Sequence, residues 1–223
     1  MKRLIPAIFI FLSLLLASPV EAARYSVSTL LELQARATAA QPGDTIVLNP
    51  GTYSGTITCA AGSGPRPVVF TSTAPESPAS YVVSTITPAS HNRFYGIRIT
   101  NGLTLPTDGK RIMVDGCQLG GSLNYSAADS SSVRNSTIEG TKLIINRLGA
   151  TGYAADDDTL ESCTFTSLNT SSTTPAIYSG YGVNGAGYGY VNRFVRRFNT
   201  FAISQTTGNA YAAAKHYKTA NLL

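Results

Sequence analysis

The amino-acid sequence predicts a right-handed parallel β-helix solenoid with an N-terminal capping helix, and three observations lead to this fold class. A helical segment with a capping signature comes first, and beyond residue 44 apolar positions recur with the period of two that strands show. An eight-residue pattern then repeats, with its first apolar anchor at residues 94, 114, 133 and 160. A period of roughly 20–25 residues made of strands and tight turns indicates a solenoid, in which each coil packs only against its neighbours.

Three segments carry this repeat most clearly, namely Ile112–Leu119, Ser131–Ile138 and Asp158–Phe165. Each holds an apolar residue, an outward polar one, small turn residues and a second apolar residue five positions after the first. Arg93–Ile99 and Phe194–Phe201 are looser copies. The leucine-rich-repeat consensus and strict hexapeptide steps are both absent, which leaves the parallel β-helix. An antiparallel β-sandwich, with short strands about 8–12 residues apart, is the alternative.

The first 22 residues have the layout of a secretory signal peptide. A basic start precedes a mostly apolar run from Leu4 to Ala17, and a small-residue cleavage site ends at Ala22. An uncleaved membrane anchor is the alternative, but the run falls short of the ~20 residues that a span needs. We therefore expect an exported protein, extracellular or periplasmic, with residues 23–223 as a single β-helix domain and no membrane span after cleavage.

The first elements of the mature chain follow from local signals. Thr29 and Glu32 form a T-x-x-E capping box, which starts a helix that ends at Gln41–Asp44. An N-terminal helix would cover a sheet edge that otherwise invites aggregation. Three strands are expected next, at Thr45–Leu48, Tyr53–Cys59 and Val68–Phe70.

Aligning the repeats places side chains on defined faces. The apolar residues expected to point inward in two columns are Val114, Leu119, Val133, Ile138, Leu160 and Phe165. Asp115, Arg134 and Glu161 share one outward position, so they should form an acid–base–acid ladder, for which a solvated row of ion pairs is the simplest interpretation. Cys117 and Cys163 lie two coils apart, beyond the ~7 Å between Cα atoms that a disulfide allows.

The C-terminus contains an alanine-rich segment after Asn209. Residues 210–220 have the highest helix propensity of the mature chain, and Asn209 is a suitable N-cap. We expect a short helix here that closes the last coil, with Tyr211 and Ala214 turned inward. A frayed tail is the alternative, because so short a helix is marginal without packing.

Charge and rare residue types narrow the function classes. The 223 residues include 17 Lys and Arg and 12 Asp and Glu, a formal net charge of +5, without the basic run of a nucleic-acid-binding arm. We therefore expect an acidic polysaccharide rather than nucleic acid as partner, and a monomer. Charged residues make up only 13%, which excludes a coiled coil, and the three cysteines lack zinc-site spacing.

The N-terminal motifs carry a family resemblance. Gln41–Leu48, Pro50–Ser54 and Arg66–Val69 resemble the entry to secreted β-helix proteins of the pectate-lyase-like group. They are most similar to the alginate and chondroitin lyases of polysaccharide lyase family six, over residues 28–100. The resemblance implies a β-elimination that removes the proton α to a uronate carboxylate, and the entry motif itself carries no chemistry.

Family six implies a Lys base after a strand ending in Asn-Lys, an Arg one coil later, and calcium held by acidic groups. Here Arg147 follows the strand Lys142–Asn146 in the base position, Tyr178 stands where the Arg is expected, and Lys142 replaces the acidic calcium ligand. These departures suggest a metal-independent site, in which Tyr178 serves as base or acid and Lys142 and Arg147 bind the carboxylate. An inactive β-helix surface is the alternative, since a guanidinium hardly ever gives up its proton.

The remaining candidates concern binding. Arg134 in the ladder, with Tyr181 and Tyr188 in the Gly-rich loop after the last clear strand, are the predicted substrate-binding residues. No metal or cofactor is predicted, although calcium bound by the acidic run 156–158 is the alternative to a solvated loop. The sequence thus predicts a secreted β-helix that contacts polysaccharide, as a lyase of a uronate-containing glycan. A non-catalytic carbohydrate-binding, adhesion or surface module is the second hypothesis.

Overall fold

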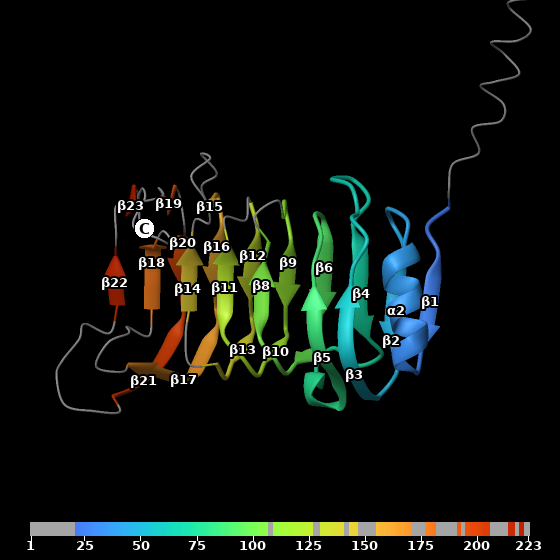
Figure 1. The fold of residues 1–223 in the computed structure, drawn as a ribbon, viewed down its shortest axis with the longest axis horizontal. Helices are drawn as coiled ribbons and strands as arrows, with labels where there is room; N and C mark the ends of the chain where they lie inside the picture. The colour runs from blue at the N-terminus through green and yellow to red at the C-terminus, as the bar shows by residue number, and fades with distance from the viewer. Residues whose placement is uncertain are drawn as a thin grey trace, which may run out of the picture.

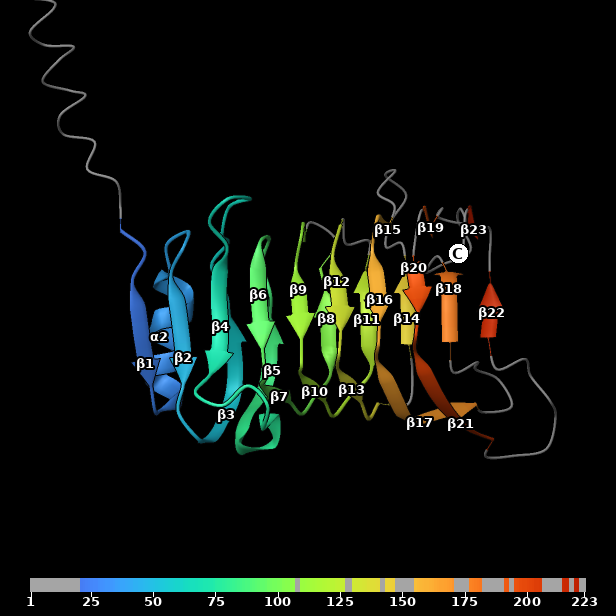
Figure 2. The ribbon, with the colours of Figure 1, turned by 180° about the vertical axis from the view of Figure 1, so that it is seen from behind.

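The computed structural model forms a right-handed parallel β-helix (Figures 1 and 2). It describes residues 21–106, 109–126, 130–140, 143–146, 155–170, 177–181, 191–192, 195–205, 214–216 and 219–220. Strands from successive coils pair in parallel, and each returns to the same sheet after one turn of the solenoid. In the described part of the chain, no helix is long and apolar enough to cross a membrane.

Sheets A and B contain most of the strands. Sheet A runs in the order β1 (Arg24–Val27), β2 (Thr45–Leu48), β4 (Val68–Ser72), β6 (Asn92–Tyr95), β9 (Met113–Asp115), β12 (Ser132–Arg134), β16 (Thr159–Glu161) and β20 (Val195–Arg197). Sheet B runs in the order β3 (Gly51–Thr58), β5 (Tyr81–Thr87), β7 (Arg98–Ile99), β10 (Gln118–Leu119), β13 (Thr137–Ile138), β17 (Thr164–Thr170) and β21 (Thr200–Gln205). A 3-10 turn, η1 (Pro78–Ser80), precedes β5.

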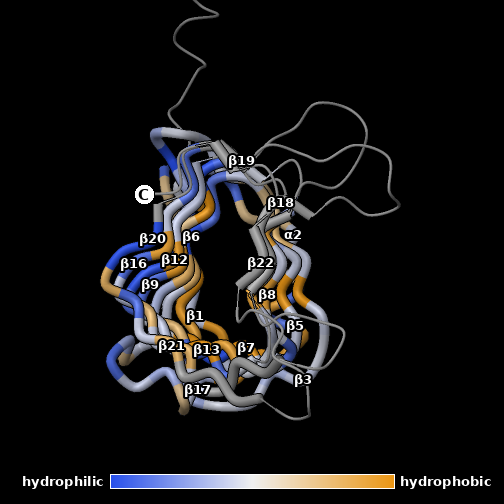
Figure 3. The backbone as a smooth tube through the Cα atoms, turned by 90° about the vertical axis from the view of Figure 1, so that its left-hand side faces the viewer, coloured by the Kyte–Doolittle hydropathy of each residue, from blue (hydrophilic) through white to orange (hydrophobic). Residues whose placement is uncertain are grey.

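Two shorter sheets complete the cross-section. Sheet C runs in the order β8 (Leu103–Leu105), β11 (Leu123–Ser126), β14 (Leu143–Asn146), β18 (Ile177–Tyr181) and β22 (Ala214–His216). Sheet D contains β15 (Ala155–Asp156), β19 (Val191–Asn192) and β23 (Thr219–Ala220). Seen along the solenoid, sheets A and C lie on opposite sides of the cross-section (Figure 3).

The strand register confirms the coil alignment made from the sequence. Phe94, Val114, Val133 and Leu160 are successive partners in β6, β9, β12 and β16. The six residues predicted to point inward are fully buried at 0% exposure, namely Val114, Leu119, Val133, Ile138, Leu160 and Phe165. The cysteines are buried and free, as expected from the two-coil separation of Cys117 and Cys163.

One corner of the solenoid depends on a left-handed backbone. Between sheets A and B, five stacked residues have φ between 49° and 61°, namely Gly96, Gly116, Asn135, Ser162 and Phe198. Glycine and asparagine tolerate this conformation, whereas a bulky side chain there is a genuine outlier. Phe198 is nevertheless 80% exposed, so its ring does not compensate for the strain by packing.

The predicted N-terminal helix is present as α2 (Leu30–Ala39), at the same end of the solenoid as β1 (Figure 1). The Glu32 amide donates to Thr29 Oγ1 over 3.2 Å, and the Glu32 carboxylate accepts from the Ser28 and Thr29 amides. These backbone hydrogen bonds lower the pKa of Glu32. Leu33 and Ala37 are buried, so α2 covers the apolar interior of the first coil.

The predicted C-terminal helix is wrong. Within residues 210–220 the structure has two short strands, β22 and β23, which pair in parallel with β18 and β19. The edge of the preceding coil offers unpaired backbone groups, and pairing with them outweighs the helix propensity of the alanines. Tyr211 lies outside the described residues.

Candidate functional site

The outer face of sheet C brings together residues far apart in the sequence. Leu103, Leu123 and Leu143 are register partners and are buried, so they form the inward column of this sheet. The next position on each strand alternates to the outer face. Thr104 and Asn124 occupy this outer position, and the strand register continues their column, which we call the outer column, through Ile144, Tyr178 and Lys215 in order along the solenoid. It therefore joins a tyrosine and a lysine on neighbouring coils.

Tyr178 and Lys215 are direct register partners in β18 and β22. Neighbouring strands lie about 4.8 Å apart, so a lysine and a tyrosine occupy adjacent backbone positions here. Sequence reasoning missed Lys215 as a site residue because it assigned the segment to a helix. The three-residue strand Ala214–His216 is too short to reveal a period of two, so no signal in the sequence identified it.

A groove borders the same face of sheet C toward its N-terminal strands. Its volume is about 520 Å³, and its polar lining includes Thr85, Thr87, Asn101, Thr104 and Asn124. Asn101 donates to Thr85 over 2.9 Å. Hydroxyl and amide groups on an open surface are suited to hydrogen bonds with sugar hydroxyls. Thr104 and Asn124 of this groove also belong to the register column that contains Tyr178.

Glycine is required beneath this groove at one position. Gly102 has φ +81°, and a Cβ atom there would lie 2.4 Å from the Ser122 carbonyl oxygen of the next coil. Glycine therefore lets the two coils approach closely at this point, and no side chain from position 102 enters the groove. Asn124 Oδ1 is buried without a hydrogen-bond partner, which leaves one amide of the groove wall unsatisfied.

The predicted catalytic residues fall only partly within the described residues. Tyr178 lies in β18, whereas Lys142 and Arg147 lie outside the described residues. In sequence these two residues flank β14, the strand that pairs with β18. Of the two tyrosines predicted to bind substrate, Tyr181 ends β18 next to a β-bulge and Tyr188 lies outside the described residues.

Arg134 is not brought to this face. It belongs to β12 of sheet A, on the other side of the cross-section from sheet C (Figure 3). Its Nε lies 2.9 Å from Asp115 Oδ2, and the Asn135 side-chain amide donates to the other oxygen of the same carboxylate. The structure thus places Arg134 in the predicted ion-pair ladder and away from Tyr178.

Within the acidic run 156–158, Asp157 and Asp158 lie in different surroundings. Asp157 is exposed in a left-handed conformation, whereas Asp158 is buried in the core. Asp158 Oδ1 accepts a hydrogen bond of 2.7 Å from the Ser131 amide, so this carboxylate serves the fold. Across the described ranges, no group of three or more His, Cys, Asp and Glu residues is placed to hold a metal ion.

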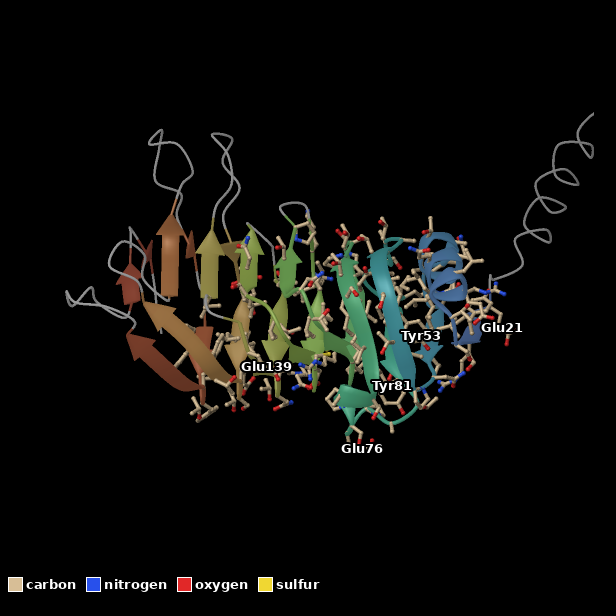
Figure 4. The ribbon with its side chains drawn as sticks, turned by 60° about the horizontal axis from the view of Figure 1, so that its bottom comes forward. Glu21, Tyr53, Glu76, Tyr81 and Glu139 are labelled. Carbon is tan, nitrogen blue, oxygen red and sulfur yellow. The ribbon has the colours of Figure 1, made fainter. Side chains whose placement is uncertain are left out.

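A second groove, of about 670 Å³, lies where the loop between β4 and β5 overhangs the corner of sheets A and B. Pro75 packs against the backbone of Gly96, where a Cβ atom would lie 2.1 Å from Pro75 Cα. Glu76 stands at the outer end of this loop (Figure 4). The floor residues Asn135 and Gln118 are already hydrogen-bonded to Asp115 and Glu139, so this groove presents fewer open polar groups.

Comparisons with known proteins support the fold. No protein-family model matches the chain, and no curated protein matches it by sequence. The structure is similar to an alginate lyase from Paenibacillus sp. str. FPU-7, with a TM-score of 0.57 and 17% identity over 90% of this chain and 97% of that one. A pectate lyase, Pel9A, is similar with a TM-score of 0.46 and 13% identity over 92% and 78% of the two chains. The alginate lyase confirms the pectate-lyase-like resemblance at the level of the fold.

Proposed function

We propose that the protein is a polysaccharide lyase that cleaves a uronate-containing glycan by β-elimination on the outer face of sheet C. The observation that carries the proposal is the register pairing of Tyr178 with Lys215, in line with the groove residues Thr104 and Asn124. The similarity of the fold to an alginate lyase agrees with this chemistry. The expected signal peptide at residues 1–22 suggests that the protein acts on its substrate outside the cytoplasm.

The reaction needs a base, a proton donor and a group that neutralises the substrate carboxylate. The base removes the proton on the carbon next to the carboxylate, a double bond forms, the C4–O bond breaks, and the leaving oxygen takes up a proton. A cation beside a phenol favours loss of the phenolic proton, so Lys215 prepares Tyr178 to act as the base. The protonated phenol then supplies a proton to the leaving oxygen.

Removal of the α proton delocalises negative charge from the α carbon onto the carboxylate oxygens of the bound uronate in the transition state. Cations placed beside it stabilise that charge. Lys142 and Arg147 flank β14 in the sequence, next to the strand of Tyr178, and we assign them this role together with Lys215. This arrangement involves no metal ion, in keeping with the basic residue at position 142 where family six has an acidic ligand.

An absorbance assay tests the proposal directly. The purified protein is incubated with alginate, chondroitin or pectate, and the ultraviolet absorbance of the unsaturated uronate product is followed. We expect product from one of them, a loss of at least about a hundredfold in rate for Tyr178→Phe, and a comparable loss for Lys215→Ala. Tyr25→Phe, in β1 of sheet A, is the matched control and should keep full activity.

Two outcomes contradict the lyase proposal. One is the absence of product from every polysaccharide with a correctly folded protein. The other is full activity of Tyr178→Phe. Retained binding of an acidic polysaccharide without cleavage would instead identify the non-catalytic binding module.

A further inference from the structure

A cluster of cations lies at the beginning of two neighbouring strands of sheet A. Arg93 is in β6, while Lys110 and Arg111 stand three and two residues before the start of β9, the next strand of the sheet. The His91 amide donates to the Lys110 carbonyl over 2.7 Å, and the Lys110 amide donates to Ser90 Oγ over 3.2 Å. These hydrogen bonds join two neighbouring coils at the residues that carry the positive charges. We call Arg93, Lys110 and Arg111, with His91, the cationic cluster.

Three arginines elsewhere in sheets A and B have acidic partners, which the cluster lacks among the described residues. Arg134 pairs with Asp115 at 2.9 Å, Arg197 with Glu161 at 2.8 Å and Arg98 with Glu139 at 3.0 Å. Within the described part of the chain, Arg93, Lys110 and Arg111 have no ion pair with an acidic side chain. Lys110 and Arg111 are exposed and Arg93 is half-exposed, so their positive charge is open to an anion from solution.

A glycine leaves this surface open, beside two residues with a left-handed backbone. His91 and Arg111 have φ of 59° and 53°, a conformation that residues with side chains rarely adopt. A Cβ atom at Gly64 would lie 3.3 Å from Arg111 Nη1 and 3.8 Å from His91 Cε1. The guanidinium and the imidazole therefore border the same point on the surface, and the absence of a side chain at Gly64 leaves that point unobstructed.

We propose that the cationic cluster is a second binding site for an acidic polysaccharide, separate from the face that carries Tyr178. Arg93 pairs in register with Met113, and Arg111 precedes Met113 by two residues, so the two guanidinium groups come from adjacent coils at staggered positions. An extended polyuronate carries one carboxylate on each sugar and can therefore meet both cations with successive carboxylates. Tyr95 lies two residues from Arg93 on the same face of β6, where its ring offers a surface for a sugar. A polynucleotide fits less well, because such binding normally uses about 6–10 phosphate contacts.

This inference rests on the proposed function for the choice of ligand. Sheets A and C are on opposite sides of the cross-section, so a chain held at the cluster lies apart from the one cleaved on sheet C (Figure 3). The cluster would keep the protein on a polyanionic matrix between cleavages. Its effect should therefore appear in binding to long polymers and not in the turnover of short oligosaccharides.

Binding is measured by calorimetric titration with alginate and polygalacturonate, in a Tyr178→Phe background that prevents cleavage. Arg93→Gln combined with Arg111→Gln should weaken binding between about tenfold and a hundredfold, since each lost contact involves a charge-assisted hydrogen bond. The matched control is Arg134→Gln combined with Arg197→Gln, which removes the same charge from paired arginines. It should change the affinity by less than about twofold.

A single-residue variant provides an internal competitor. Gly64→Glu places a carboxylate beside Arg111 and His91, and it should weaken binding relative to Gly64→Gln, which has the same size without the charge. Equal affinities of these two variants overturn the proposal. So do equal losses in the two double variants, or tighter binding of double-stranded DNA than of either polyuronate.

Turnover separates this inference from the proposed function. With Tyr178 intact, Arg93→Gln combined with Arg111→Gln should keep the kcat of the unchanged protein on a short uronate oligosaccharide. A fall in that kcat contradicts a separate site. Cluster-dependent binding by a protein that cleaves no polysaccharide would support the second site while overturning the lyase proposal.

Discussion

The Nε atom of Arg134 lies 2.9 Å from Oδ2 of Asp115, on the neighbouring strand of sheet A. The register pairs these two residues and pairs Arg134 with Glu161 on its other side. Glu161 in turn pairs with Arg197, whose Nε lies 2.8 Å from its carboxylate. The outward position of the repeat therefore carries alternating charges over four coils, one more than the sequence alignment had assigned.

The faces of sheets A and B can be tested by paired substitutions. Ile138→Ala removes a fully buried side chain between two coils and should lower the free energy of unfolding by about 2–5 kcal/mol. Arg134→Gln should lower it by less than about 1 kcal/mol, because the Arg134 side chain is 40% exposed and its ion pair is screened. Denaturant melts measure both, and similar losses would contradict the assigned faces.

The left-handed corner predicts opposite effects at two stacked positions. A Cβ atom at Gly116 meets nothing within 4 Å, so Gly116→Ala should cost about 1 kcal/mol through its φ of +61° alone. Phe198→Gly relieves the same conformation at φ 55° and, because Phe198 is 80% exposed, loses little packing. We expect it to stabilise the protein by about 1 kcal/mol. Thermal or denaturant melts that show destabilisation at Phe198 would indicate that its ring makes stabilising contacts.

The buried thiols predict a loss of stability at alkaline pH. Burial raises the pKa of Cys117 to about 12 and that of Cys163 to about 11, whereas an unfolded thiol titrates near ~8.5. Below that value both states hold the protons and the stabilisation is complete. As the pH rises toward 11–12 the unfolded chain releases protons that the folded chain retains, so the free energy of unfolding falls.

Unfolding measured from pH 7 to pH 10 should therefore show a decline that Cys117→Ala makes shallower, even though its cavity lowers stability at every pH. An unchanged slope in that variant would contradict the burial of the thiol. In the same pH range the native cysteines should resist alkylation, and they should react once the chain is unfolded.

The coil alignment was predictable because each coil of the middle section has an apolar anchor and a small residue at the turn. Val114, Val133 and Leu160 show both features, and their register followed from spacing alone. The next coil breaks the pattern, since Arg196 is the partner of Leu160 and burial lowers its pKa. An arginine at an inward position gives no periodic signal, which is why the last copy of the repeat looked weak.

The candidate site was harder to predict for a physical reason. Outer positions of a solenoid experience no common packing constraint, so Thr104, Asn124 and Tyr178 share no sequence pattern, although one column contains them all. Tyr178 was found through family resemblance rather than through spacing. Lys215 was lost because helix propensity reports on an isolated segment, while its strand exists through pairing with β18.

The C-terminal strands provide a test that separates structure from chemistry. Truncation after Gly208 removes β22 and β23, which leaves the edges of β18 and β19 unpaired. We expect a lower free energy of unfolding, a tendency to self-associate through the open edges, and no lyase activity. Lys215→Ala keeps both strands, so it should abolish activity. The free energy of unfolding of this variant, measured in denaturant, should stay within about 0.5 kcal/mol of that of the unchanged protein. A truncated protein that is equally stable and monomeric would show that these strands do not close the last coil, and an active one would exclude Lys215 from the mechanism.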